Sequence, residues 1–151
     1  MPVSYLQTEF NEHQGRLSPD GRWMAYASDE SGRSEVYVRA FPTPGTRWRV
    51  STDGGSDPRW RRDGKELFYQ STDRTLLAAD VKADISFTVS APRALFKMPI
   101  ADRGARMTEV SNASSYEPTG DGQRFLINAL IEGPPPPPVT VILHWPAALR
   151  R

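Results

Sequence analysis

The sequence predicts an all-β protein that contains about three copies of one four-stranded unit, and two observations support this prediction. The dipeptide Asp-Gly occurs three times in similar surroundings, within SPDGRWMAYAS, RRDGKELFYQS and TGDGQRFLINA. After each dipeptide, aromatic and aliphatic residues form a short run bounded by turn residues, which is typical of a strand and does not follow the period of a helix. One turn and one strand repeated at wide intervals indicate a repeat architecture.

The spacing of the repeats identifies the unit. Asp20, Asp63 and Asp121 begin the three dipeptides, and they are separated by 43 and then by 58 residues. A four-stranded blade of a β-propeller takes roughly 40 to 45 residues, so the first interval is one blade and the second is one blade with an insertion. The insertion is expected in the polar segment 101–115. Since complete propellers have about four to eight blades, the chain is expected to form half of a six-bladed ring.

The Asp-Gly pair recurs because of turn geometry. In the first repeat Pro19 presets the backbone of a type I turn, Asp20 can accept a hydrogen bond from the nearby backbone, and Gly21 adopts the positive φ that closes the hairpin. We therefore interpret these aspartates as structural and not as catalytic.

Each unit is expected to place four strands in sequence order. The second strands are expected near Trp23 to Ala27, Glu66 to Gln70 and Arg124 to Asn128. Third strands follow a hairpin, at VYVRAF, LLAADV and VTVILHW, and fourth strands are expected at RWRVS and RALF. Because the second strands are apolar at nearly every position, both of their faces are expected to be covered by neighbouring sheets.

The whole chain, residues 1–151, is expected to form one partial propeller. Tyr5 and Leu6 precede the first Asp-Gly turn much as Trp48 and Val50 precede the second. This correspondence predicts that the N-terminal segment is a fourth strand, which would complete the last blade. The expected boundaries are 1–10 for this strand, 11–52 for the first blade, 53–100 for the second and 101–151 for the third.

The stretch LSPDGRWMAYASDESGRSEVYVRAF resembles the repeat of TolB-type, WD-repeat-like β-propellers. The order of three further segments, Leu6 to Thr8, Arg59 to Tyr69 and Ile142 to Trp145, is similar to the C-terminal propeller of bacterial membrane serine/threonine protein kinases. The resemblance implies a propeller fold and, for a kinase-linked propeller, a periplasmic or extracytoplasmic location. It departs from the repeat pattern at Arg61-Arg62 and at Thr119-Gly120, where Ser-Pro would stand.

Composition excludes several classes of partner and site. The 19 basic and 18 acidic residues nearly cancel, so neither nucleic acid nor an anionic membrane is an expected partner. The sequence has no cysteine, and therefore no disulfide or thiolate metal site. Its apolar runs are shorter than the roughly 20 residues of a membrane span, and the N-terminus lacks the basic and apolar regions of a signal peptide.

The sequence predicts no catalytic residue. The glycine-rich loop, strand lysine, catalytic aspartate and Asp-Phe-Gly of a protein kinase are not present as a set. Ser56, in GGSDP, imitates a nucleophile elbow, but Pro58 stands where the last glycine is needed. We interpret Ser56 as a loop serine.

No metal or cofactor site is expected either. His13 and His144 lie in different units, and His144 is interpreted as a packing residue at a strand end. Asp29-Glu30 and the run from Asp53 to Asp57 lack calcium-loop spacing and are interpreted as solvated hairpin tips. Asn112-Ala113-Ser114 has the form of an N-glycosylation acceptor and is interpreted as a chance occurrence. The prolines at 134–138 are interpreted as stiffening a hairpin connection and not as a polyproline ligand. The arginine and tryptophan residues of 47–49 and 59–62 are interpreted as parts of blade strands and not as a nucleic-acid platform.

Two functional classes remain, with a third alternative. The chain is expected to be a non-catalytic propeller module that binds a protein or a small ligand at its rim or central channel. The alternative is the gating or substrate-selecting propeller of a peptidase, and the third is a gene fragment without selected activity. The C-terminal LHWPAALRR resembles the end of the kinase-linked propellers, which favours the first. A head-to-tail homodimer is expected to close a six-bladed ring through Tyr5, Leu6, Val141 and Leu143.

Overall fold

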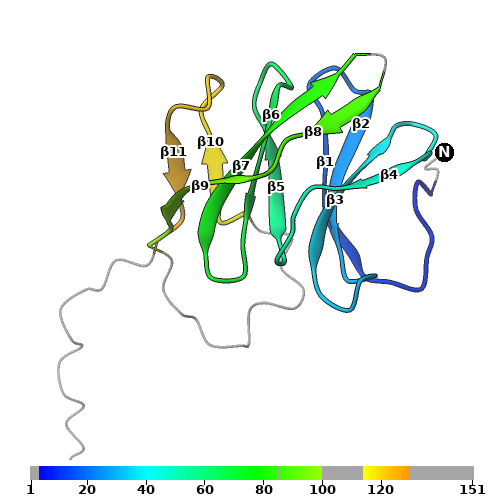
Figure 1. Ribbon diagram of the computed structural model, residues 1–151, viewed down its shortest axis with the longest axis horizontal. Coiled ribbons are helices and arrows are strands. Elements are labelled where there is room, and N and C mark those ends of the chain that lie inside the picture. The colour runs from blue at the N-terminus through cyan, green and yellow to red at the C-terminus, as the bar shows by residue number, and fades with distance from the viewer. Residues whose placement is uncertain (1–3, 85, 100–113, 130–151) are drawn as a thin grey trace, which may run out of the picture.

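A computed structural model describes residues 4–84, 86–99 and 114–129, and all regular structure in these ranges is β-strand (Figure 1). None of these residues forms a helix of the length and apolarity that crossing a membrane requires. The strands are β1 (Glu12–Leu17), β2 (Trp23–Ser28), β3 (Glu35–Ala40), β4 (Arg47–Arg49), β5 (Ser56–Trp60), β6 (Glu66–Gln70), β7 (Thr75–Ala83), β8 (Phe87–Val89), β9 (Arg93–Lys97), β10 (Tyr116–Pro118) and β11 (Phe125–Ile127). They confirm the all-β prediction.

The first sheet is an antiparallel meander with the order β1-β2-β3-β4. Ala25 on β2 pairs with Val38 on β3, and Val38 pairs with Trp48 on β4. The pairing of β1 with β2 shifts between His13 and Arg16, which marks a bulge. This sheet has the four sequential strands that the sequence predicts for one unit.

The second sheet repeats the meander with one addition. Strands β5, β6 and β7 pair in order, and β9 pairs with the first half of β7, as expected for RALF. The second half of β7 continues to Ala83 and pairs with β8, a strand that the sequence pattern did not predict. The third sheet, within the described residues, consists of β10 and β11, which pair antiparallel through Glu117 and Leu126.

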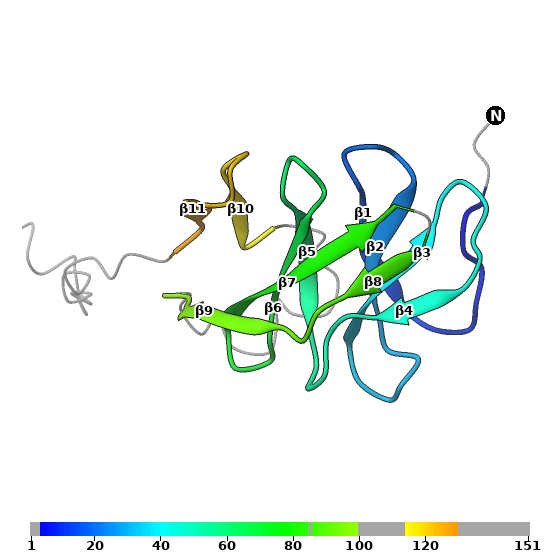
Figure 2. The ribbon, with the colours of Figure 1, turned by 45° about the horizontal axis from the view of Figure 1, so that its top comes forward.

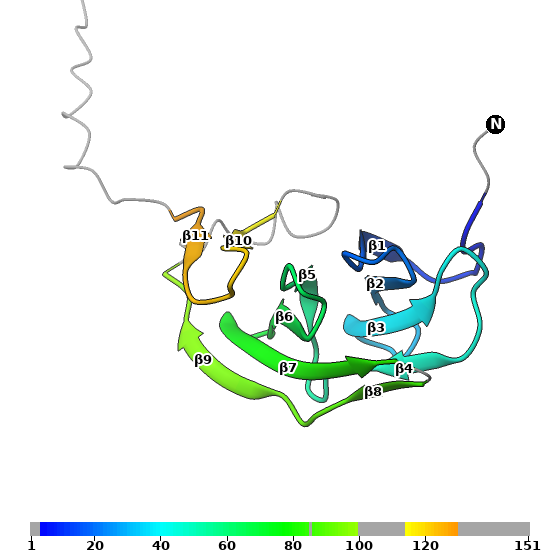
Figure 3. The ribbon, with the colours of Figure 1, turned by 90° about the horizontal axis from the view of Figure 1, so that it is seen from above.

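The three sheets follow one another along an arc. Seen from above, β1, β5 and β10 form the inner edge of the arc, and β4, β8 and β9 lie at its outer edge (Figure 3). The oblique view shows β8 beside β4 (Figure 2). Phe87 on β8 is buried there, with its ring 5.2 Å from that of Trp48 and 5.0 Å from that of Trp23. The added strand therefore covers the outer part of the junction between the first and second sheets.

The hydrophobic core is divided between the two junctions of the arc. Leu67 and Tyr69 on β6 pack against Ala25, Val36 and other residues of the first sheet. Phe68, between them in sequence, packs on the opposite face with Tyr116 and Phe125 of the third sheet. Successive side chains of a strand point to opposite faces, so a strand with two covered faces is apolar throughout. This is the pattern that the sequence shows after each Asp-Gly pair.

The Asp-Gly turns have the geometry expected of them. Gly21, Gly64 and Gly122 have φ values of 70°, 72° and 70°. In the second turn Asp63 accepts a hydrogen bond from the backbone N–H of Lys65. Its hydrogen bond from the Arg61 guanidinium lowers the pKa of Asp63 to about 2. Asp20 accepts hydrogen bonds from the backbone N–H and the guanidinium of Arg22, and Asp121 accepts them from the backbone N–H of Gln123 and the hydroxyl of Thr119, in agreement with a structural role.

The N-terminal segment lies along the outer face of the first sheet and forms no strand between residues 4 and 10. The Tyr5 hydroxyl donates a hydrogen bond to the carbonyl of Ala40, and the Tyr5 ring lies 5.3 Å from that of Phe41. That residues 1–10 complete the last blade of another molecule stays a prediction. The predicted strand VTVILHW, with Val141 and Leu143, lies outside the described residues.

Candidate functional site

Three repeat-related residues stand at the inner edge of the arc, each six positions before the aspartate of its Asp-Gly turn: Gln14, Asp57 and Ser115. Gln14 and Asp57 lie in bulges of β1 and β5, where the strand register shifts. Both have positive φ values, 57° and 54°. Positive φ is uncommon for residues other than glycine and costs roughly 1 to 2 kcal/mol, so its recurrence at this position points to a specific requirement.

The requirement is a hydrogen bond between adjacent sheets. The backbone N–H of Asp57 donates to Oε1 of Gln14 at 2.7 Å. The backbone N–H of Ser115 in turn donates to Oδ2 of Asp57 at 2.8 Å. At both junctions, then, the side chain of one unit accepts a hydrogen bond from the backbone of the next unit. We call this series of contacts the inner relay.

Asp57 also forms a buried ion pair. Nη2 of Arg59 lies 2.9 Å from Oδ1 of Asp57, and the two side chains are only 5% and 3% exposed. Nε of Arg59 lies 3.1 Å from Oε2 of Glu117, whose side chain is exposed. The interpretation of Asp57 as part of a solvated hairpin tip is therefore wrong. It is right for Asp53, whose side chain is 94% exposed.

Tyr116 closes the site toward the second sheet. Its hydroxyl donates a hydrogen bond of 2.9 Å to the backbone carbonyl of Asp57. Burial, followed by the charge of Asp57, raises the pKa of Tyr116 well above its ordinary value. The phenol therefore remains a neutral hydrogen-bond donor, and it holds β10 against the bulge of β5.

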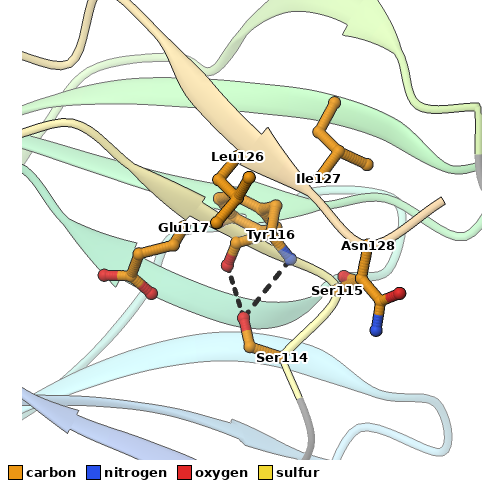
Figure 4. Close-up of a pocket in the computed structure, with 7 residues that line it drawn as sticks. All are labelled: Ser114, Ser115, Tyr116, Glu117, Leu126, Ile127 and Asn128. Carbon is orange, nitrogen blue, oxygen red and sulfur yellow. Dashed lines mark hydrogen bonds between the residues drawn. The ribbon is translucent and has the colours of Figure 1, made fainter.

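A hollow of about 340 Å³ lies on the side of β10 and β11 (Figure 4). Leu126 is 77% exposed there, because Phe125 and Ile127 on either side of it point toward the second sheet. The hydroxyl of Ser114 bonds to the backbone N–H and carbonyl of Tyr116, which fixes the entry to β10 (Figure 4). The residues lining the hollow are Ser114, Ser115, Tyr116, Glu117, Leu126, Ile127 and Asn128.

Several polar groups of this site are paired within the protein. The hydroxyl of Ser115 lies 2.8 Å from Oδ2 of Asp57 and 3.0 Å from Oε1 of Gln70, so its single proton is directed to acceptors within the protein. The carboxylate of Asp57 accepts hydrogen bonds from the backbone N–H and the hydroxyl of Ser115, and its Oδ1 lies 2.9 Å from Nη2 of Arg59. What the site presents outward is an apolar side chain, a carboxylate and an amide.

The other residues considered from the sequence are dispersed. Ser56 is the first residue of β5 and pairs with Gln70, so its interpretation as a loop serine is wrong. Nδ1 of His13 on β1 lies 3.4 Å from the carbonyl oxygen of Asn11. Glu30, after β2, pairs with Arg47, and its side chain is only 10% exposed, so the interpretation as a solvated tip is wrong for Glu30 and right for Asp29. Within residues 4–84, 86–99 and 114–129, no three acidic or histidine side chains gather in a way that could hold a metal ion. His144, the Asn112 triplet and the prolines at 134–138 fall at least partly outside the described residues.

The tryptophans considered from the sequence lie in the sheets. Trp48 is on β4 and packs on Trp23 with a ring separation of 5.5 Å. Trp60 ends β5, and its indole N–H donates to the backbone carbonyl of Arg16 across the first junction. These tryptophans therefore serve the packing of neighbouring sheets.

Comparison with known proteins gives a partial similarity. The chain is 33% identical over 89 residues to dipeptidyl aminopeptidase BI from Pseudoxanthomonas mexicana. The match covers 57% of this chain but 12% of the peptidase. No family model matches the chain, so the resemblance to TolB-type and kinase-linked propellers remains a prediction.

Proposed function

We propose that this chain is a non-catalytic segment of a β-propeller that binds a protein or a small ligand through its inner strands and its open sheet faces. The observation that carries the proposal is the inner relay. The contacts Gln14 to Asp57 and Asp57 to Ser115 join different sheets but use the same repeat position. A contact that recurs at each junction is the sign of an array in which every unit packs on the next.

The chemistry at the inner edge agrees with a binding role. Asp57 and Arg59 neutralise each other below the surface, whereas Glu117 and Leu126 are exposed beside the hollow. Propellers support many unrelated activities, so the fold alone does not name the ligand. Glu117 and Leu126 are therefore available to a second molecule.

The matched relative favours a second candidate, in which the segment belongs to a peptidase. In that case the propeller would admit or select substrates for a hydrolase domain, as the alternative from sequence supposes. The partial match to a dipeptidyl aminopeptidase supports this candidate over the kinase-linked one. A peptidase reading frame or a kinase reading frame adjoining this sequence in the genome would decide between the two.

Activity assays on the purified chain test the shared element of both candidates. We expect no turnover of dipeptidyl p-nitroanilides, of an activated ester or of ATP above the buffer blank. Turnover that is lost in Ser56→Ala or in Ser115→Ala would overturn the proposal, because those residues carry the hydroxyls that could act as nucleophiles near the inner edge. Thr88→Ala, at an exposed position on β8, is the matched control.

A further inference from the structure

The two ends of the arc carry exposed apolar side chains. On the first sheet, Leu17 pairs with Met24 on the face turned away from the second sheet, and Leu17 is 46% exposed. On the third sheet, Leu126 points away from the second sheet. Three of the four large apolar side chains that the described residues expose, Phe10, Leu17 and Leu126, belong to these outer faces or to the segment along them.

The repeat register relates the two outer faces to a junction that already exists. Leu126 occupies the position of Phe68 in the second sheet, and Met24 occupies the position of Phe125 in the third. Phe68 and Phe125 meet edge to face across the junction of those sheets, with 5.1 Å between ring centroids. If the same contact is repeated one unit further along the arc, Leu126 packs against Met24 of another molecule.

The surroundings of Met24 can receive such a side chain. A hollow of about 150 Å³ lies between the N-terminal segment and the first sheet. Its lining includes Leu6, Met24 and Tyr26. An apolar side chain that enters this hollow would be covered as Phe68 is covered within the chain.

The charges at the inner edge are also complementary. Arg16, Arg59 and Glu117 share one repeat position, four residues before each turn aspartate. Arg59 and Glu117 pair across the second junction. One unit further, Glu117 would meet Arg16 of another molecule, again with opposite charges. The inner relay can continue in the same way. The hydroxyl oxygen of Ser115 can accept a hydrogen bond from the backbone N–H of Gln14 in the other molecule, because a hydroxyl accepts as well as donates.

We propose that the outer face of β10 and β11 binds the outer face of β1 and β2 in a second copy of this chain, head to tail. This rests on the proposed function in one respect, that the three sheets are blades of one propeller. A head-to-tail contact is heterologous and ends only when a ring closes. The three described sheets of one copy and those of a second would together make a ring of six, within the range of about four to eight blades that propellers use.

Sedimentation velocity on the full chain tests the proposal. We expect a dimer at micromolar concentration. Leu126→Glu is expected to give a monomer with an unchanged far-ultraviolet circular dichroism spectrum. Thr88→Glu, which places the same charge at an exposed position of β8, is expected to remain dimeric. A monomeric wild-type chain, or a dimeric Leu126→Glu variant, would overturn the proposal.

Cross-linking tests the orientation of the two copies and does not depend on the folding of Leu126→Glu. The sequence has no cysteine, so Leu126→Cys and Met24→Cys each introduce a single thiol. A short bis-maleimide is expected to link an equimolar mixture of the two variants and to link neither variant alone. Linkage of Leu126→Cys alone would mean that two outer faces of β10 and β11 meet each other, and absence of linkage in the mixture would mean that Leu126 does not lie beside Met24 of the other copy; each result overturns the proposal.

The same measurements separate this inference from the proposed function. A monomer without enzymatic turnover rejects self-association and leaves the binding role in place. Turnover that depends on Ser56 or Ser115 rejects the binding role whatever the oligomeric state.

Discussion

Replacement of Asp57 by alanine removes the residue on which both the inner relay and the buried ion pair depend. The substitution takes away the acceptor for the backbone N–H of Ser115 and the counterion of Arg59. It also places alanine at a φ of 54°. The effect is expected in the free energy of unfolding, since each loss concerns a buried group of the folded state.

The magnitude follows from the burial of the pair. Removal of one partner from a buried ion pair costs about 3 to 5 kcal/mol. Arg59 keeps its contact with Glu117, which favours the lower end, about 3 kcal/mol. Alanine at positive φ adds about 1 kcal/mol. We therefore expect the free energy of unfolding of Asp57→Ala to fall by about 4 kcal/mol, a large part of the about 5 to 15 kcal/mol of a typical domain.

Urea unfolding at one fixed protein concentration, followed by tryptophan fluorescence, measures this loss. Asp57→Asn keeps an acceptor oxygen and tolerates positive φ, so it is expected to lose only about 1.5 to 3 kcal/mol, the contribution of hydrogen bonds to a charged group. Asp53→Ala, at an exposed site paired with Arg33, is the control and is expected to lose less than about 1 kcal/mol. If Asp57→Ala unfolds at the same urea concentration as Asp53→Ala, the inner relay does not join the sheets.

Two further predictions concern the turns. Gly54→Ala is expected to destabilise more than Gly21→Ala: both glycines have positive φ, but a Cβ at Gly54 would lie 2.6 Å from Cγ2 of Thr72, whereas a Cβ at Gly21 meets nothing within 4 Å. Thermal melts of the two variants compare them, and equal midpoints would contradict the steric argument. The pKa of Asp63 is about 2 in the folded state and 3.8 ordinarily. Its charged form therefore stabilises the fold at a pH above the unfolded-state pKa of 3.8, and this contribution is lost as the pH falls through the folded-state pKa of about 2. The stability difference between wild type and Asp63→Asn should accordingly shrink from pH 5 to pH 2 in urea titrations; a constant difference would contradict it.

The parts of the fold that could be predicted depend on neighbouring residues. The second strands were expected near 23–27, 66–70 and 124–128, and β2, β6 and β11 are at Trp23–Ser28, Glu66–Gln70 and Phe125–Ile127. Their signal is local, because an Asp-Gly turn precedes an apolar run in each case. Strand β8 was not predicted because three residues, FTV, give too short a pattern, and its pairing depends on how far β7 continues.

The candidate site was harder to predict because its partners are distant in the sequence. Gly, Ser, Asp and Pro in GGSDP are turn formers, so the local pattern indicated an exposed loop. Burial of Asp57 is decided by Arg59 and by Ser115, which is 58 residues further along the chain. A signal was nevertheless present: Gln14, Asp57 and Ser115 share one column of the repeat, and each carries a side-chain oxygen.

The inner relay places an unequal demand on the two units that it joins. The accepting unit must supply a side-chain oxygen at one position, which glutamine, aspartate and serine all provide. The donating unit supplies only a peptide N–H, which any residue except proline possesses. Units with divergent sequences can thus follow one another without a matched pair of substitutions. After gene duplication or recombination, the inner relay can therefore form at a new junction whichever residue other than proline donates the N–H.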